Sequence, residues 1–171
     1  HNSMLIHVSR FQLWQNHIKD LVVRIFIYYK QEIEVGDRMV LEELRQVFEV
    51  DRNDYKSYKT TTQSILESRY KNIDDSLIVH SWEDVKGQLF KAVQKITVKS
   101  INGSSNDVLT YYDNKEDGIS VIAIGGDKLS RGLTLEGLSI SYFLRASKMY
   151  DTLMQMGRWF GYRSGYVDLC R

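Results

Sequence analysis

The sequence predicts an α/β fold: an open parallel sheet with helices on both faces. Short, nearly continuous apolar runs at 4–8, 119–124 and 138–144 have the length and composition of buried strands, and a further strand is predicted at 96–101. Apolar residues spaced three and four apart predict helices at 11–33 and 82–95. Because apolar runs and helical segments alternate along the chain, a parallel sheet covered by helices is favoured.

Length and composition restrict the class of protein. The chain has 171 residues, the size of one ordinary domain, and a net charge of +1, which gives no global attraction for nucleic acid. No apolar run approaches the roughly 18–20 residues of a membrane-spanning helix, so we expect no membrane partner. Cys170 is the single cysteine, which excludes an internal disulfide and favours a reducing, cytoplasmic location. With four histidines beside it, no structural zinc site is expected, and we assign no metal ligand.

The first 76 residues contain the predicted strand 4–8, the helix 11–33 and a charged segment. In the helix, apolar residues from Phe11 to Ile33 recur on one face. Residues 36–76 differ in character, because 16 of these 41 positions are charged. Two helices with polar surfaces, at 38–50 and 59–71, fit this segment. We interpret it as a helical insertion on the edge of the domain, and the pattern leaves open whether it docks a partner or is only solvated packing.

The remainder of the chain supplies most of the predicted sheet. Strands are predicted at 77–80, 96–101, 119–124 and 138–144, and helices at 82–95 and 150–159. Asn102–Gly103 predicts a turn after the strand 96–101. The run 166–170 predicts the beginning of another strand, which the end of the chain interrupts. Residues 1–171 are therefore expected to form a single domain whose last strand is cut short.

Polar and glycine-rich segments follow the predicted strands. Ligands of open parallel sheets bind at the carboxyl ends of the strands, so these segments are the candidate binding positions. They are Ser9–Arg10, Asn102–Gly103, the segment 125–132 and the segment 157–163. Within the last segment, Arg158 and Arg163 lie among glycine and aromatic residues. A guanidinium group suits a bidentate contact with phosphate, although arginines stacked on neighbouring aromatic rings give the same pattern.

Tests for several catalytic motifs are negative. A P-loop needs a Gly-Lys pair, which occurs nowhere in the chain, and the segment 125–132 does not match the dinucleotide fingerprint. No glutamate is followed two residues later by lysine, so the acid–lysine core of restriction-type nucleases is missing. No Gly-x-Ser-x-Gly elbow occurs either. The chain alone therefore lacks the parts that hold a nucleoside triphosphate with magnesium.

Four sequence blocks resemble motifs of superfamily-two helicases. VIAIGGDKLSRGLTLEG at 121–137 resembles motif V, and QMGRWFGYR at 155–163 resembles motif VI, which carries arginine fingers. Residues 4–11 are similar to motif IV, and residues 98–105 to the next strand-end contact with nucleic acid. More narrowly, LSRGLTLEGL, SYFLR, YDTLMQMGRWFGYR and INGSS resemble the Z-one domain family. This family is labelled as an endonuclease and is joined to superfamily-two helicase lobes in bacterial proteins.

The resemblance implies a second RecA-like lobe and a role for each matched position. Arg158 or Arg163 would reach the γ-phosphate of ATP as an arginine finger, and Gln155 would orient them. The positions implied to approach the nucleotide are Gly132, Leu133 and Thr134. The positions implied to contact the nucleic-acid backbone are Ser9, Arg10, Asn102, Gly103, Ser130 and Arg131.

Two positions depart from the helicase pattern. Gly161 stands where motif VI has its second arginine, and the next arginine, Arg163, comes two residues later. Thr134 stands where motif V has an aspartate that contacts ribose. The sequence therefore leaves open which arginine is the finger.

The resemblance also implies partners outside this chain. ATP with Mg²⁺ would be held mainly by an N-terminal RecA-like lobe of the same parent protein, so the chain alone is expected to be inactive. DNA is the expected substrate, and a nuclease or methyltransferase subunit is a further candidate partner in a bacterial restriction-modification or defence system. Two alternatives stay open: a non-motor module for nucleic-acid binding or assembly, and the endonuclease domain that the family label suggests.

Overall fold

The computed structural model describes residues 1–8, 11–101, 118–126, 135–144, 154 and 164–171. In this part of the chain, four strands form one parallel sheet and four helices are present, which confirms the α/β fold and is consistent with a RecA-like open sheet. The chain divides into two compact units. We call His1–Ile25, Lys95–Gly161 and Cys170–Arg171 the sheet unit, and Phe26–Gln94 and Tyr162–Leu169 the helical unit. No helix in the described ranges is long and apolar enough to cross a membrane.

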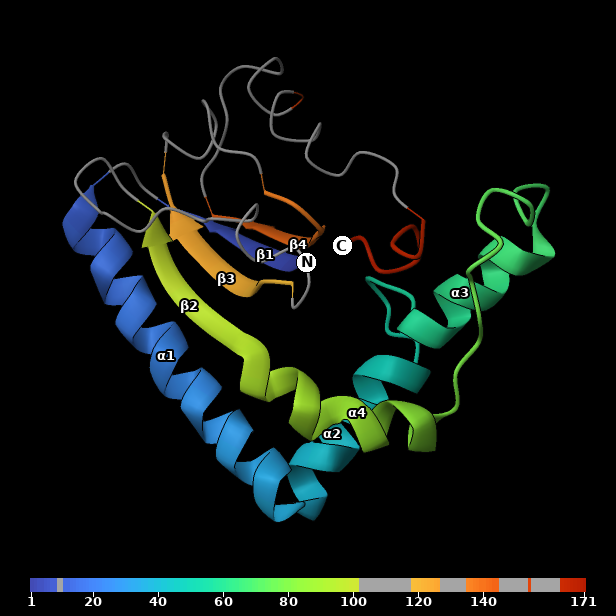
Figure 1. Cartoon of the computed structure of the whole chain (residues 1–171), viewed down its shortest axis with the longest axis horizontal. Coiled ribbons are helices and arrows are strands. Elements are labelled where there is room, and N and C mark those ends of the chain that lie inside the picture. Colours follow the sequence, from blue (N-terminus) through green and yellow to red (C-terminus); the bar gives the residue numbers. More distant parts are fainter. Residues whose placement is uncertain (9–10, 102–117, 127–134, 145–153, 155–163) are drawn as a thin grey trace. The chain divides into compact units, whose positions relative to one another are not determined.

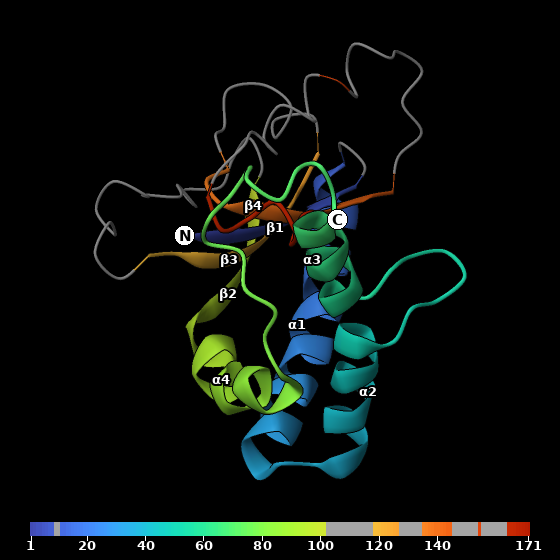
Figure 2. The same cartoon turned by 90° about the vertical axis from the view of Figure 1, so that its right-hand side faces the viewer.

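The sheet unit contains all four strands, in the order β2-β3-β1-β4 (Figure 1). The strands are β1 (Asn2–His7), β2 (Ile96–Ile101), β3 (Ser120–Gly125) and β4 (Leu138–Phe143). Turning the molecule by 90° shows β1 between β3 and β4 again (Figure 2). All neighbouring strands are parallel. These strands lie within two residues of the predicted ones.

Two hydrophobic clusters form the core of the sheet unit. Successive side chains of a strand point to opposite faces of the sheet, so β1 contributes Leu5 to one cluster and Ile6 to the other. The first cluster consists of Leu5, Ile101, Val121, Ala123, Leu135 and Leu138. The second consists of Ile6, Val8 and Ile124, with Ile18 and Val22 of the following helix packed against it. Each fully buried aliphatic side chain stabilises the fold by about 1.5–3 kcal/mol.

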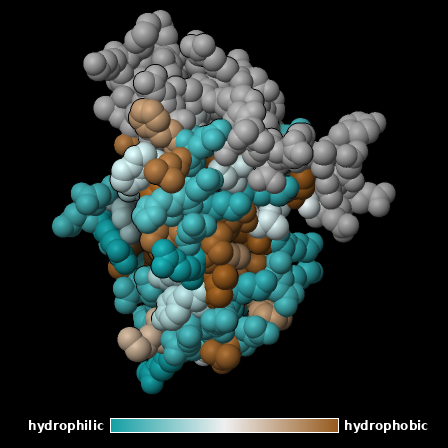
Figure 3. Space-filling model, turned by 90° about the vertical axis from the view of Figure 1, so that its left-hand side faces the viewer, coloured by the Kyte–Doolittle hydropathy of each residue, from teal (hydrophilic) through white to brown (hydrophobic). Residues whose placement is uncertain are grey.

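Helix α1 (Gln12–Val35) has about the predicted length, and only part of its apolar face is buried. Ile18 and Val22 pack on the sheet, whereas Phe11, Trp14 and Ile25 are more than half exposed. Exposed apolar side chains are visible between hydrophilic ones in Figure 3. Helical spacing predicts which residues share a face, but how far the sheet extends beneath that face depends on tertiary structure.

The helical unit contains the end of α1 and three further helices. These are α2 (Arg38–Glu49), α3 (Tyr58–Glu67) and α4 (Trp82–Lys95, whose last residue belongs to the sheet unit). Helix α1 ends at Gly36, whose φ of 73° lets the Asp37 N–H donate to the Glu32 carbonyl at 2.8 Å. The Asp37 carboxylate then caps α2, accepting from the N–H groups of Met39 and Val40 at 2.9 Å each. The predicted helices at 38–50, 59–71 and 82–95 are thus confirmed, with α3 ending four residues early.

Helices α3 and α4 also begin at side-chain caps. Ser57 Oγ accepts from the Thr60 N–H at 3.2 Å at the start of α3. Before α4, Ser81 Oγ accepts from the Asp84 N–H at 3.2 Å, while the Asp84 carboxylate accepts from the Ser81 N–H at 3.0 Å. This reciprocal capping box satisfies N–H groups that have no partner inside the helix.

Two predicted strands are wrong. Residues 77–80 form no strand, because the described part of the helical unit contains no strand for them to pair with. Residues 166–170 are also not a strand, since a turn covers 164–169. Strand-like pairing begins only at Arg171, which donates its N–H to the Ser139 carbonyl at 2.8 Å and accepts from the Ser141 N–H at 2.9 Å.

Three expectations from the sequence are not tested by the structure and stay predictions. The predicted turn at Asn102–Gly103 lies outside the described residues. The predicted helix 150–159 also lies outside them, except for Met154, which is helical. The expectation of a single domain with an insertion at 36–76 stays a prediction, since compact units also occur within one domain.

Candidate functional site

The four strands end side by side at one edge of the sheet (Figure 1). Their last residues are Ile101 of β2, Gly125 of β3, His7 of β1 and Phe143 of β4. The register pairs Ile101 with Gly125, Gly125 with His7, and His7 with Phe143. We call these four residues the strand-end row. Because the strands are parallel, the row is the carboxyl edge of the sheet, where open α/β sheets bind their ligands.

The predicted binding segments follow this row in the chain. Asn102 comes directly after Ile101, Ser9 comes two residues after His7, and the segment 127–134 begins two residues after Gly125. The predicted site residues themselves lie outside the described residues; they are Ser9, Arg10, Asn102, Gly103, Ser130, Arg131, Gly132, Leu133, Thr134, Gln155, Arg158 and Arg163. The structure thus brings together the strand ends that precede three of these segments.

His7 joins β1 to β4 at the centre of the strand-end row. Its side chain is 2% exposed, and its ring stacks on that of Phe143 with centroids 4.5 Å apart and planes 16° apart. The His7 carbonyl accepts from the Leu144 N–H at 3.0 Å, and Val8 donates to the Gly125 carbonyl at 2.8 Å. Sequence reasoning assigned His7 only to a strand. A polar ring at the end of a buried apolar run is the signal that could have singled it out.

The residues after the segment 127–134 are attached to the sheet. Leu135 is 1% exposed and belongs to the first core cluster. The buried Ser3 of β1 donates its hydroxyl to the Glu136 carbonyl at 2.7 Å and its N–H to the Gly137 carbonyl at 2.8 Å. The end of the predicted motif V block is therefore anchored beside β1.

In the helical unit, one carboxylate holds the residues that directly follow Arg163. Asp74, which is 3% exposed, accepts from the Ser164 hydroxyl at 2.9 Å and from the Gly165 N–H at 2.5 Å. It also accepts from the Ser76 hydroxyl at 2.5 Å and the Ser76 N–H at 3.1 Å. These hydrogen bonds, that of the Ser76 hydroxyl first and that of the Gly165 N–H second, lower the pKa of Asp74 to about 2. The charged form therefore holds this turn at neutral pH.

A second hydrogen bond attaches the same turn to α3. The hydroxyl of Thr62 donates to Asp168 at 2.6 Å, and both side chains are buried. Within the turn, the Leu169 N–H donates to the Tyr166 carbonyl at 3.0 Å. Sequence reasoning missed Asp74, Thr62 and Asp168, because nothing in the local pattern pairs residues about 90–106 positions apart.

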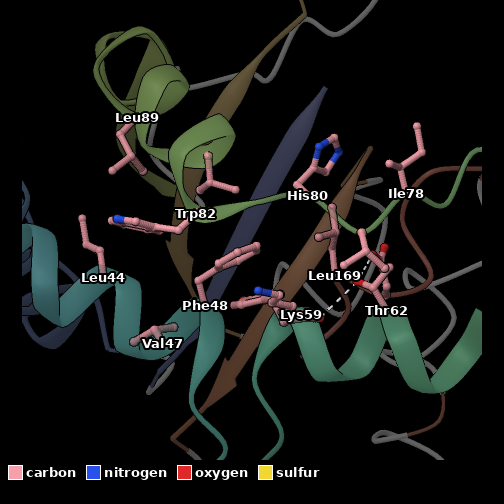
Figure 4. A pocket seen from close by; sticks show the side chains of 14 residues that line it. Leu44, Val47, Phe48, Lys59, Thr62, Ile78, His80, Trp82, Leu89 and Leu169 are labelled. Carbon is pink, nitrogen blue, oxygen red and sulfur yellow. Dashed lines mark hydrogen bonds between the residues drawn. The ribbon is translucent and has the colours of Figure 1, made fainter.

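The helical unit also contains an apolar cavity of about 330 Å³ (Figure 4). Phe48 of α2 and Trp82 of α4 form part of its wall, with ring centroids 6.2 Å apart. Lys59, on the same wall, is paired with Glu49 at 2.9 Å. The other labelled lining residues are Leu44, Val47, Thr62, Ile78, His80, Leu89 and Leu169. Because the lining is predominantly apolar, the cavity suits an uncharged apolar group.

No group of three or more histidine, cysteine, aspartate or glutamate residues in the described part of the chain is arranged to hold a metal ion.

Comparison with known proteins gives one match. The model of the Z1 (Z-one) domain family matches residues 1–171. No curated protein and no solved structure matches the chain.

Proposed function

We propose that this chain, which belongs to the Z1 domain family, is the second RecA-like motor lobe of an ATP-dependent DNA helicase or translocase in a bacterial restriction-like or defence protein. The observation that carries the proposal is the strand-end row of Ile101, Gly125, His7 and Phe143. In a parallel α/β sheet this edge is where ligands bind. Three of the blocks that resemble helicase motifs leave the sheet from it.

In this role the chain supplies an arginine to ATP. Arg158 or Arg163 stabilises the negative charge that develops on the γ-phosphate during transfer. Such a contact raises kcat by a factor of about 10³–10⁵. A guanidinium group is suited to this contact because its fork of N–H donors matches phosphate oxygens and keeps its charge at all physiological pH values. Gln155 orients the arginine, and Gly132, Leu133 and Thr134 approach the nucleotide.

ATP and Mg²⁺ bind chiefly to the other lobe of the parent protein. That lobe supplies the P-loop, which this sequence lacks. Mg²⁺ shields the phosphate charge when it is bound there. Hydrolysis therefore requires both lobes, and this chain alone is expected to show no turnover.

The chain also contacts the DNA backbone through residues after three strand ends. Ser9 and Arg10 follow β1, Asn102 and Gly103 follow β2, and Ser130 and Arg131 lie in the segment after β3. Contacts of this kind position a nucleic-acid strand without reading its sequence. A motor that moves along DNA needs this property.

DNA-stimulated ATP hydrolysis by the parent protein tests the proposal. Arg158→Ala and Arg163→Ala are compared with wild type and with Arg69→Ala, an exposed arginine of the helical unit that serves as the matched control. We expect one of the first two changes to lower turnover at least 100-fold while nucleotide binding is retained, and the control to be unaffected.

Two other outcomes would contradict the motor function and support one of the two alternative functions. If both variants hydrolyse ATP like the wild type but bind DNA more weakly, the chain is a non-motor nucleic-acid-binding module. If the parent protein cleaves DNA in a metal-dependent reaction that persists after ATP is removed, and residues of this chain are needed for it, the chain is an endonuclease domain.

A further inference from the structure

We propose that the apolar cavity of the helical unit binds a small, uncharged aromatic molecule that carries one hydrogen-bond donor. The described lining comes from α2, α3, α4, residues 78–80 and the turn 164–169, all of which belong to the helical unit. The inference goes beyond the proposed function and does not depend on it.

The volume of the cavity sets the size of the ligand. It is about 330 Å³, and proteins bind small molecules in pockets of about 300–1,000 Å³. Liquid water occupies about 30 Å³ per molecule, so the cavity has room for roughly ten non-hydrogen atoms. A fused bicyclic ring system has this size.

Aromatic and aliphatic side chains of α2 and α4 form one side of the cavity (Figure 4). Phe48 and Trp82 have ring centroids 6.2 Å apart, and Trp82 is buried. Val85 and Leu89 follow Trp82 on α4, and Leu44 precedes Phe48 on α2. Aromatic rings attract one another in offset-stacked and edge-to-face arrangements. This wall therefore favours an aromatic ligand over a purely aliphatic one.

A buried pair of polar side chains also lines the cavity. The Thr62 hydroxyl donates to a carboxylate oxygen of Asp168 at 2.6 Å. A hydroxyl has a single proton, which is engaged in this contact, whereas a carboxylate accepts up to about four hydrogen bonds. The pair therefore offers acceptor oxygens to a ligand, so the matching group on the ligand is an N–H or O–H donor.

The charges around the cavity favour an uncharged ligand. Lys59 lines the cavity, but its ammonium group is paired with Glu49 at 2.9 Å. An anionic ligand would have to compete with Glu49 for this ammonium group. A charged group of either sign would also lose its water in a predominantly apolar cavity, which is costly.

The cavity has an apolar opening and a wall that is held in place. Ile78 is 63% exposed and Leu169 is 38% exposed, so apolar side chains of the lining border the opening. Asp74 accepts hydrogen bonds from the Ser164 hydroxyl and the Gly165 N–H, which hold the turn that carries Leu169. Because this wall is already ordered, little conformational freedom is lost when a ligand binds.

Isothermal titration calorimetry of the parent protein with indole as the probe tests the proposal. Indole is an uncharged bicyclic aromatic molecule with one N–H donor, and benzofuran has the same shape with an oxygen atom in place of this N–H. We expect indole to bind with a dissociation constant below about 1 mM. Benzofuran should bind about tenfold more weakly, because it cannot donate to Asp168.

Two variants show whether the probe binds in the cavity. Val85→Phe places a larger side chain in the wall and is expected to weaken indole binding at least tenfold. Val93→Phe is the matched control, because Val93 is a half-buried valine of the same helix that lies outside the described lining. It should leave the affinity for indole within about twofold.

Two further variants test the hydrogen bond. Asp168→Asn keeps the size of the side chain but replaces one acceptor oxygen by an N–H₂ donor. It should reduce the preference for indole over benzofuran from about tenfold to less than about threefold. Asp75→Asn changes an exposed aspartate outside the described lining and should retain the full preference.

The proposal is overturned if indole does not bind, or if Val85→Phe and Val93→Phe weaken its binding equally. Thermal unfolding shows whether each variant folds, and Leu89→Phe, from the same wall, replaces Val85→Phe if that variant does not. Equal affinities for indole and benzofuran, or an unchanged preference in Asp168→Asn, would overturn the assignment of a ligand with a donor. Indole binding does not involve ATP, so failure of the motor proposal leaves these expected results unchanged.

Discussion

The ring of His7 stacks on the ring of Phe143, with centroids 4.5 Å apart and planes 16° apart, at the carboxyl edge of the parallel sheet. The two residues are also paired in the register of β1 and β4. A stacked aromatic pair therefore joins two neighbouring strands at the level from which the predicted binding segments leave. The stability of this edge can be measured directly.

Replacing Phe143 by leucine is expected to lower the free energy of unfolding by about 1 kcal/mol. Leucine keeps an apolar side chain at the site but removes the ring that stacks on His7, an interaction worth about 0.5–1.5 kcal/mol beyond burial. The measurement is urea unfolding followed by circular dichroism. Phe90→Leu, which changes a more exposed ring of α4, is the control and should have a smaller effect. Equal losses in the two variants would contradict a specific role of the stack.

Leu135→Ala is expected to lower the free energy of unfolding by about 2–5 kcal/mol. Leu135 is 1% exposed and packs in the first core cluster, so the change removes buried contacts and leaves a cavity. Leu13→Ala is the matched control, since Leu13 is 82% exposed and should change stability by less than about 0.5 kcal/mol. Urea unfolding measures both. A loss below about 1 kcal/mol for Leu135→Ala would show that this residue does not anchor the core.

The stabilising effect of Asp74 is expected to disappear in acid. Its pKa in the folded chain is about 2, below the usual value of 3.8, so folding favours the charged form. The stabilisation is fully present above about pH 4 and is lost as the pH falls from there toward 2. The difference in unfolding free energy between wild type and Asp74→Asn should therefore shrink across this range.

Urea unfolding at pH 5, 4 and 3 measures this difference. The exposed neighbour Asp75 provides the control, because Asp75→Asn should stay within about 0.5 kcal/mol of the wild type at each pH. If the difference in unfolding free energy between wild type and Asp74→Asn is constant from pH 5 to pH 3, the hydrogen bonds to the charged carboxylate do not stabilise the fold.

Arg10→Ala in the parent protein is expected to weaken DNA binding about equally for all sequences. The proposed function makes Arg10 a backbone contact, so its loss should reduce the slope of log affinity against log salt concentration by about one. Fluorescence anisotropy with labelled DNA at several salt concentrations measures the slope. Arg38→Ala, which removes an exposed arginine at the start of α2, should leave it unchanged. An unchanged slope for Arg10→Ala would show that Arg10 does not contact the DNA backbone.

Much of the fold could be predicted because its elements have strong local signals. The strands β1, β3 and β4 are apolar runs, and α1 and α4 follow helical spacing. The caps at Asp37 and at the Ser81 and Asp84 pair are findings of the structure. The two failures depend on tertiary structure. The run 77–80 has no strand to pair with in the described part of the helical unit, and the run 166–170 begins within the turn 164–169, so that only Arg171 pairs with β4. Backbone pairing is a property of the neighbour and not of the run itself.

The candidate site was predictable only in part, for a related reason. The sequence places polar and arginine-containing segments after strands, and the register then shows that Ile101, Gly125, His7 and Phe143 end side by side. The roles of Asp74 and Thr62 had no local signal, since each bonds to a residue about 90 or more positions away.

The sequence by itself determined, to within a few residues, the four strands and four helices that the structure describes, and it determined which polar segments follow the strands. Side-chain chemistry and spacing act over a few residues, so these features are encoded locally. Tertiary structure decided the order β2-β3-β1-β4, the stacking of His7 on Phe143 and the attachment of residues 164–169 to Asp74 and Thr62. These features depend on hydrogen bonds and contacts between distant parts of the chain, which form only when the core has assembled.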